Sequence, residues 1–206
     1  MYVVSIILIL AGIIVAAAGA IRDRARDAVS LNNLFQLSKS LNLYQADNGK
    51  YPFSVDNSAG MSDFWVNAIK PYIGKQTGLF TSPNEKRHNA LSDYGVNNLV
   101  LNPSRIGVAG SVGGPRVAAT LSRLSKTVLI CDARDASGSD PAGSWMVDGE
   151  QWIRNGKGMR SPFSASPPRN SHETVHAAFI DGHVEAIAGE RWVADRATLF
   201  DPENSP

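Results

Sequence analysis

The chain begins with an unbroken apolar segment that runs into an amphipathic one. Residues 2–21 carry no charged side chain, and a run of roughly twenty such residues is long enough to cross a hydrocarbon core as a helix. From residue 31 onward, Leu and Tyr recur every three or four positions with polar residues between them. Because no proline lies between residues 2 and 47 and Asn48-Gly49 is a typical stop, the pattern predicts one helix of about 46 residues, roughly 70 Å long.

The remaining pattern predicts shorter elements joined by loops. Ser62 as an N-cap and Pro71 as a stop predict a short helix between them. The apolar run 127–131 predicts a buried strand. Residues 74–118 are rich in Gly, Pro, Asn and Ser, which indicates loops around a short strand near "SDYGVNNLVL". Residues 134–171 are expected to form a long surface loop.

The stretch "VHAAFIDGHVEAIA" predicts a β-hairpin, because Asp181-Gly182 between apolar-rich runs is typical of a two-residue type I′ turn. Such a loop places Ile180 opposite His183 and Phe179 opposite Val184. One face of the hairpin is then wholly apolar and is expected to face the core. The outer face would carry His176, Ala178, Ile180, His183, Glu185 and Ile187.

The histidines of this hairpin do not predict a metal site. The rows of His176 and His183 lie four residues apart, or roughly 13 Å at 3.3 Å per residue, which is too far for two ligands of one zinc ion. A pairing of Glu185 with either histidine on the outer face remains open.

Composition narrows the function classes. The 20 basic and 19 acidic residues leave a net charge of +1 without a long basic run, so nucleic acid is not an expected partner. The single cysteine, Cys131, allows no intramolecular disulfide and is expected to be buried. No G-x-S-x-G or glycine-rich phosphate loop is present, so no enzymatic chemistry and no cofactor are predicted. The acids of residues 132–150, with backbone carbonyls, are the candidate ligands for Ca²⁺, although their spacing does not match an EF-hand loop.

The apolar segment has two interpretations. A membrane anchor is favoured, because the run exceeds a signal-peptide core and no Lys or Arg precedes it. A cleaved signal peptide is the alternative, since "AAAGA" at 16–20 offers small residues for cleavage. Three arginines follow the segment, interleaved with Asp23 and Asp27, so charge alone does not fix the orientation.

Several separate stretches resemble the pilin-like proteins of type IV pili and type II secretion, within the group that carries a C-terminal His-x9-Asp-Gly motif. These stretches are the apolar helix with "RDRARDAVSLNNLFQLSKSLNLYQADNGKYP", then "FWVNAIKPYIGKQTGLFTSPNE", "DYGVN" and "HAAFIDGHV". Asp181, Gly182 and His183 match the motif, whereas the nearest histidine to its first position is His172. The family's basic leader and Phe-Thr-Leu-x-Glu start do not occur in this sequence, so processing is not carried over.

The resemblance implies an α+β pilin-like fold, with a long N-terminal helix packed on an antiparallel β-sheet. Residues 1–21 would be the transmembrane half of the helix, 22–48 its amphipathic half, and 49–206 an extracytoplasmic head. The implied function is a non-enzymatic structural subunit of a pseudopilus, a type II secretion or type IV pilus-like assembly. The implied location is the bacterial inner membrane, which the chain would cross once, with the head in the periplasm. Partners would be other pilin-like subunits and the assembly proteins of the secretion system or pilus, contacted through Val3, Ile6, Ile7, Leu10, Ile13 and Ile14.

A second hypothesis belongs to another class. The chain would be a membrane-anchored extracytoplasmic binding module that forms no filaments and takes a glycan or Ca²⁺ in the loop 134–171. Trp145 and Trp152 would supply surfaces on which a sugar stacks, and their exposure on one face would favour this hypothesis.

Overall fold

The structure is a computed structural model that describes residues 2–54, 64–86, 88–101, 121–135, 142–144, 146–147, 164–165 and 173–202. Within residues 2–17, the backbone is described together with the side chains of Val3 and Ile7 only.

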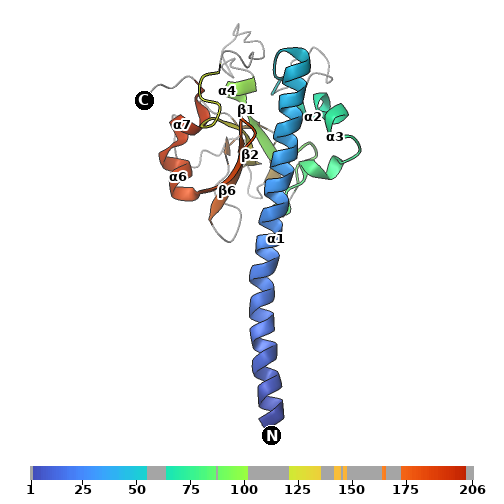
Figure 1. The fold of residues 1–206 in the computed structure, drawn as a ribbon, viewed down its shortest axis with the longest axis vertical. Coiled ribbons are helices and arrows are strands. Elements are labelled where there is room, and N and C mark those ends of the chain that lie inside the picture. The colour runs from blue at the N-terminus through green and yellow to red at the C-terminus, as the bar shows by residue number, and fades with distance from the viewer. Residues whose placement is uncertain are drawn as a thin grey trace.

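One long helix dominates the molecule, as the sequence predicts. Helix α1 runs from Tyr2 to Asn48 and ends at Gly49, whose φ of 73° suits the left-handed residue that follows many helices. Its C-terminal half lies along the head, while its N-terminal half projects from the head as a rod (Figure 1). The heptad-like leucines Leu34, Leu37 and Leu41 are fully buried against the head, so they fix α1 to it.

The head is built on a mixed sheet whose central order is β4-β1-β2-β6-β7. Strand β1 pairs antiparallel with β2, β2 with β6, and β6 with β7, but β4 pairs parallel with β1. The α+β class is therefore confirmed, and the sheet is antiparallel except at one edge. The strands are β1 (Tyr94–Asn97), β2 (Val128–Asp135), β4 (Met146–Val147), β6 (Thr174–Phe179) and β7 (Val184–Ala188), with β3 (Ala142–Gly143) and β5 (Ser164–Ala165) also paired to β2.

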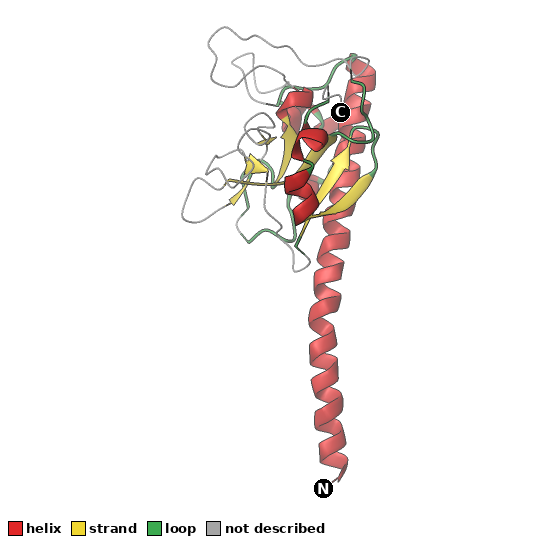
Figure 2. Cartoon of the chain, turned by 90° about the vertical axis from the view of Figure 1, so that its left-hand side faces the viewer, coloured by secondary structure: helices red, strands yellow, loops and turns green. Residues whose placement is uncertain are grey.

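Helices cover both faces of this sheet. Helix α1 packs on one face, and α6 (Gly189–Ala194) with α7 (Arg196–Phe200) packs on the other, an arrangement that Figures 1 and 2 show from two directions. Trp192 and Phe200 meet edge to face in the second layer, with ring centroids 5.2 Å apart. Because both faces are covered, alternation along a central strand does not separate buried from exposed side chains.

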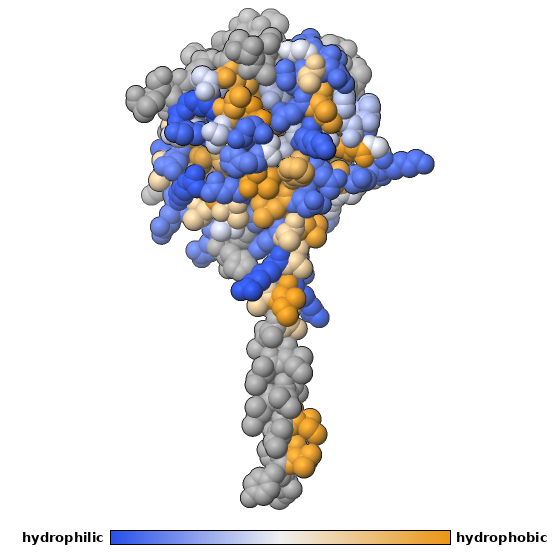
Figure 3. Space-filling model, viewed as in Figure 1, coloured by the Kyte–Doolittle hydropathy of each residue, from blue (hydrophilic) through white to orange (hydrophobic). Residues whose placement is uncertain are grey.

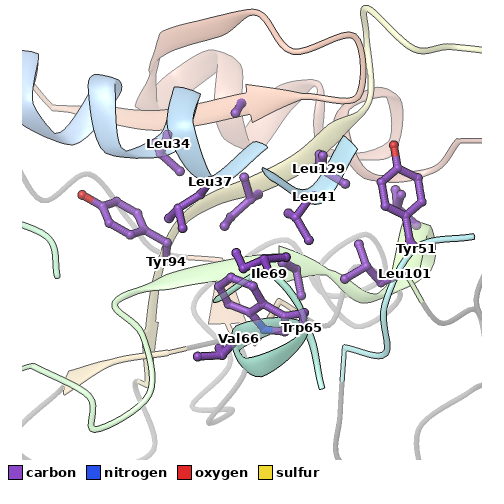
Figure 4. Packing of buried hydrophobic residues seen from close by; sticks show 14 of the residues in the cluster. Leu34, Leu37, Leu41, Tyr51, Trp65, Val66, Ile69, Tyr94, Leu101 and Leu129 are labelled. Atoms are coloured by element: carbon purple, nitrogen blue, oxygen red, sulfur yellow. The ribbon is translucent and has the colours of Figure 1, made fainter. Parts of the chain in front are cut away.

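The short helices close the core beside α1. They are α2 (Trp65–Ala68), α3 (Lys70–Ile73), the 3₁₀ turn η2 (Thr77–Phe80) and α4 (Asn98–Leu101). Trp65 and Ile69 point toward the leucines of α1 and toward Leu129 (Figure 4). Pro71 was predicted to stop a helix, but it lies in the first turn of α3, where the N–H that proline lacks would have no partner within the helix. The predicted N-cap, Ser62, lies outside the described residues.

Strand β2 is longer than the predicted 127–131 segment. Its pairing with β6 shifts between Val128 and Ile130, so Leu129 is a bulge residue. Beyond the bulge, the strand continues through Asp132 to Asp135. Asp132, one of the acids considered as Ca²⁺ ligands, is therefore held inside the sheet.

The hairpin forms, but its predicted register is wrong by one residue. Ala178 lies opposite Val184 and Ala177 opposite Glu185. Gly182 N–H donates to the Phe179 carbonyl at 3.0 Å, and Gly182 has a φ of 92°, as in a three-residue loop with a glycine bulge. The slip moves Val184 and Ala186 to the α1 side of the sheet and Glu185 and Ile187 to the other side.

Candidate functional site

Among the described side chains of helix α1, large apolar ones are exposed on both the projecting half and the docked half. Val3 is 70% exposed and Ile7 58% exposed, and both belong to the set that the resemblance implies for subunit contacts. The side chains of Ile6, Leu10, Ile13 and Ile14 lie outside the described set. The exposed large apolar residues continue up the helix as Ile21, Val29, Phe35 and Leu43, and Figure 3 shows apolar surface on the rod and on the head.

Beside the head, part of this apolar surface borders a shallow groove of about 250 Å³ between α1 and α3. Phe35 and Leu43, 47% and 42% exposed, line it with the partly exposed Tyr72. Lys39, which lies about one helical turn from Phe35 and from Leu43, adds a cation to the lining. The groove therefore extends the apolar face of the rod onto the head.

A buried histidine lies where α1 leaves the head. His176 on β6 is fully buried, not on a solvent-facing surface as predicted, because α1 covers its side of the sheet. Its Nε2 lies 3.6 Å from Oδ1 of Asp27 on α1, and its Nδ1 lies 3.4 Å from Oδ2 of Asp132 on β2. The backbone N–H of His176 also donates to Asp132 Oδ2 at 3.1 Å. Helix and sheet thus meet through an imidazole placed between two carboxylates.

Tyr94 extends this polar contact one turn up the helix. Its hydroxyl hydrogen-bonds Ser30 at 3.2 Å and accepts from the Asn33 amide at 3.4 Å. Burial, with a smaller contribution from the Asp132 carboxylate, raises the pKa of the Tyr94 phenol to about 12. The tyrosine therefore stays neutral and acts as a hydrogen-bonding strut between β1 and α1.

A second group of charged residues surrounds the same end of the head. Asp93 is buried, accepts hydrogen bonds from the backbone N–H groups of Ser82 and Asn89, and lies 2.5 Å from Nδ1 of the half-exposed His88. Glu85 pairs with Arg134 at 3.4 Å. These contacts fix the loop 81–93, whose Asn84 donates to Asp27 at 3.0 Å. The loop consequently supports the carboxylate that faces His176.

These groups do not converge on a metal position. In the part of the chain that the structure describes, no set of three or more His, Cys, Asp or Glu side chains could hold a metal ion. His176 stands between its two carboxylates, so Asp27 and Asp132 lie at opposite edges of the ring. Asp132, one of the acids considered for Ca²⁺, belongs to this internal contact. Asp140, Asp148 and Glu150 lie outside the described residues.

The three residues that match the family motif shape the hairpin turn. The Asp181 carboxylate accepts the backbone N–H of His183 at 3.1 Å and lies 2.6 Å from its Nδ1. The His183 ring stacks on Phe179, with centroids 4.2 Å apart and planes 9° from parallel. The turn is tied to α1 because the Asn42 amide donates to the Ile180 carbonyl at 3.0 Å. Asp181, Gly182 and His183 therefore form a structural corner docked on the helix.

Glu185 pairs with neither His176 nor His183 among the contacts of the described residues. Glu185 forms an ion pair with Arg191 of α6, and the register places it on the opposite side of the sheet from His176. Cys131 is buried, as predicted.

Sequence reasoning missed Asp27 and Asp132 as partners of His176. In the sequence, Asp27 bears only on membrane orientation, and Asp132 is only one of the acids considered for Ca²⁺. A usable signal was present, since "ICDA" sets an acid directly after an apolar strand while "VHAAFI" sets a histidine within another. Two opposite charges inside apolar strands predict a buried pair.

The binding-module hypothesis falls on segments that are not described. Trp145, Trp152 and most of 134–171 lie outside the described residues. Across the described residues, no helix meets the combined length and hydropathy needed to cross a bilayer. Comparison with protein-family models, curated proteins and solved structures finds no match to this chain.

Proposed function

We propose that the chain is a non-enzymatic, pilin-like structural subunit that assembles with other copies or related subunits through helix α1. The observation that carries the proposal is the division of one continuous helix into a docked half and a projecting half (Figure 1). A 47-residue helix that contacts its own head along only one half has the other half available for a partner.

The chemistry of the projecting half supports a partner that is itself apolar. Residues 2–21 carry no charge, and Val3 and Ile7 are exposed on the rod. Covering the apolar surface of a helix is favourable, by roughly 25 cal/mol for each Å² removed from water. It is covered either by lipid acyl chains or by equivalent helices, and small residues such as Gly12 and Gly19 permit close helix packing. We therefore propose a membrane-anchored state and an assembled state of the same helix, with the head extracytoplasmic.

The head supports this role by holding the docked half rigidly. Leu34, Leu37 and Leu41 fill its core, and Asn42 and Tyr94 bond it to the hairpin and the sheet. A head-to-tail interface repeated between copies generates an open helical filament when the rotation between copies does not close a ring. Phe35 and Leu43 extend the apolar surface of the rod onto the head, so they are proposed to contact the next subunit.

Cysteine cross-linking tests the proposal. Ile7→Cys and Ile14→Cys variants of the full chain are produced in bacterial cells, and membranes and sheared filaments are oxidised before non-reducing electrophoresis. The proposal expects disulfide-linked dimers through the rod and recovery of the chain with the membrane fraction. The native Cys131 is fully buried and does not compete for cross-linking.

Lys86→Cys, on an exposed loop of the head, is the matched control for random collision. Dimers at positions 7 and 14 in excess of those at 86 support helix-mediated assembly. Equal yields at all three positions, or a monomeric anchored product throughout, would refute assembly and favour the binding module.

A further inference from the structure

Another pocket lies on the head, among the short helices α2 and α3, the turn η2 and the loop 89–91. It shares no lining residue with the groove between α1 and α3. Its volume of about 260 Å³ is close to the roughly 300 Å³ of the smaller pockets that bind small molecules. Val66, Phe80 and Leu91 give it an apolar wall.

Internal contacts fix the walls of this pocket. The Phe80 ring packs on Trp65, with ring centroids 5.8 Å apart. The Asn89 amide is held at both ends, because it donates to the Gly143 carbonyl at 3.0 Å and accepts the Leu91 N–H at 2.9 Å. A pocket that is already formed loses little conformational entropy when a ligand enters, so it can bind a ligand that makes few contacts.

The polar groups of the pocket favour an anion. The lining, which belongs entirely to the described residues, contains Lys70 as its cation and no acid. The Lys70 ammonium donates to Asn67 Oδ1 at 2.7 Å, and since an ammonium carries three N–H groups, it keeps donors for a ligand. Thr77 and Thr81 add hydroxyls, which can donate to the same anion.

The charge and the apolar wall together narrow the class of anion. One ammonium with two hydroxyls balances a single negative charge, which suits a carboxylate better than a phosphate dianion. An inorganic anion would leave the apolar wall uncovered, whereas a ligand with an apolar or aromatic body would remove that wall from water.

We propose that this pocket binds a small organic carboxylate with an apolar or aromatic body. The carboxylate lies against Lys70 and the two threonine hydroxyls, and the body lies against the apolar wall. The site belongs to the head and does not rest on the assembly of α1, so failure of the cross-linking test would leave it standing.

Phenylacetate is the probe for this site, and phenylacetamide, a neutral molecule of nearly the same shape, is its matched control. Two-dimensional nitrogen-15/proton NMR of the full chain in zwitterionic micelles at neutral pH follows the amides of residues 66–70, 77–81 and 89–91. Phenylacetate is expected to shift these amides with a dissociation constant on the order of 1 mM, as its small size dictates. Phenylacetamide should bind roughly fivefold more weakly. Equal affinity for the two molecules, or no shift of these amides by phenylacetate well above 1 mM, would overturn the proposal.

Lysine variants assign the binding to the pocket. Lys70→Met removes the charge and keeps the length of the side chain, so it should weaken phenylacetate binding roughly fivefold and leave phenylacetamide binding unchanged. Lys75→Met alters an exposed lysine that does not line the pocket, and it should bind both molecules as the original chain does. Equal weakening by both substitutions would attribute the effect to net charge and contradict the site. Where Lys70→Met does not fold, the comparison of the two molecules on the unmodified chain decides.

The carboxylate can come from a free acid or from the C-terminus of a polypeptide, and a peptide probe separates these sources. The dipeptide acetyl-Ala-Phe presents the same benzyl group beside a main-chain carboxylate. Tighter binding of this dipeptide than of phenylacetate would assign the site to a polypeptide C-terminus, and weaker binding would assign it to a free acid. Either result upholds a carboxylate site when Lys70→Met weakens the tighter ligand.

Discussion

At the scale of single residues, Tyr94 shows how a buried hydroxyl makes stability depend on pH. The pKa of the folded phenol is raised from its ordinary value of 10 to about 12, first by burial and then by Asp132. In alkali, the unfolded chain therefore ionises before the folded one. The stabilising effect is complete below pH 10 and is lost as pH rises toward about 12, by on the order of 3 kcal/mol.

Tyr94→Phe is expected to remove this part of the alkaline loss. The variant should be less stable than the original by about 1 kcal/mol at neutral pH, because Ser30 and Asn33 lose a partner. Its stability should then fall less steeply between pH 10 and 12. Urea unfolding, monitored by Trp fluorescence, measures both the stability at neutral pH and its slope between pH 10 and 12. The buried Tyr51, whose pKa is also raised, contributes to the slope that remains, so the comparison is between the two slopes. Identical slopes would contradict the assignment.

Single residues also mark the limit of prediction from sequence. The burial of Cys131 followed from the apolar run around it. The partners of His176 did not, because Asp27 lies 149 positions away on another element, and sequence spacing carries no information about such a contact. A similar limit applies to Asp93, whose role depends on the backbone N–H groups that a folded loop presents to it.

At the scale of elements, the hairpin shows which features of a turn decide its register. Asp-Gly correctly predicted the position of the turn, but the dipeptide is compatible with loops of two or three residues. The longer loop is formed here, with Asp181 accepting the His183 N–H and Gly182 in the left-handed region. Because helices pack on both faces of the sheet, positions of both alternating sets in β6 are buried, and alternation along β6 does not decide the register.

Gly182→Ala tests the importance of this backbone conformation. A Cβ at Gly182 would have room, since the nearest atom is the Asn42 amide nitrogen at 3.9 Å, so the expected cost of about 1–2 kcal/mol comes from the positive φ alone. Gly182→Asn should cost less, because Asn adopts this region more readily. Gly78→Ala, at a site with open space and no positive φ, is the control. Equal losses for Gly182→Ala and Gly78→Ala in urea unfolding would count against the strained turn.

At the scale of the whole molecule, the most regular pattern was the most predictive. The unbroken helix over residues 2–48 follows from periodicity, because a sustained repeat adds up many weak preferences, whereas the α+β class was implied by the resemblance. The parallel pairing of β4 with β1 does not, since Met146–Val147 is too short to carry a pattern. The pilin-like role and the membrane location remain proposals that rest on the projecting helix and its composition.

Phe35 and Leu43 allow the proposed assembly surface to be altered without damage to the head. Both side chains are nearly half exposed, so Phe35→Ser with Leu43→Ser should change the unfolding temperature little. If copies pack over this groove, the double variant should reduce rod cross-linking through Ile7→Cys several-fold, because apolar contact area is lost from the interface. Leu124→Ser with Val193→Ser removes two comparably exposed apolar side chains that do not belong to α1 and is the matched control. Loss of cross-linking in both double variants would indicate a general effect of surface polarity, and loss in neither would restrict the interface to the rod.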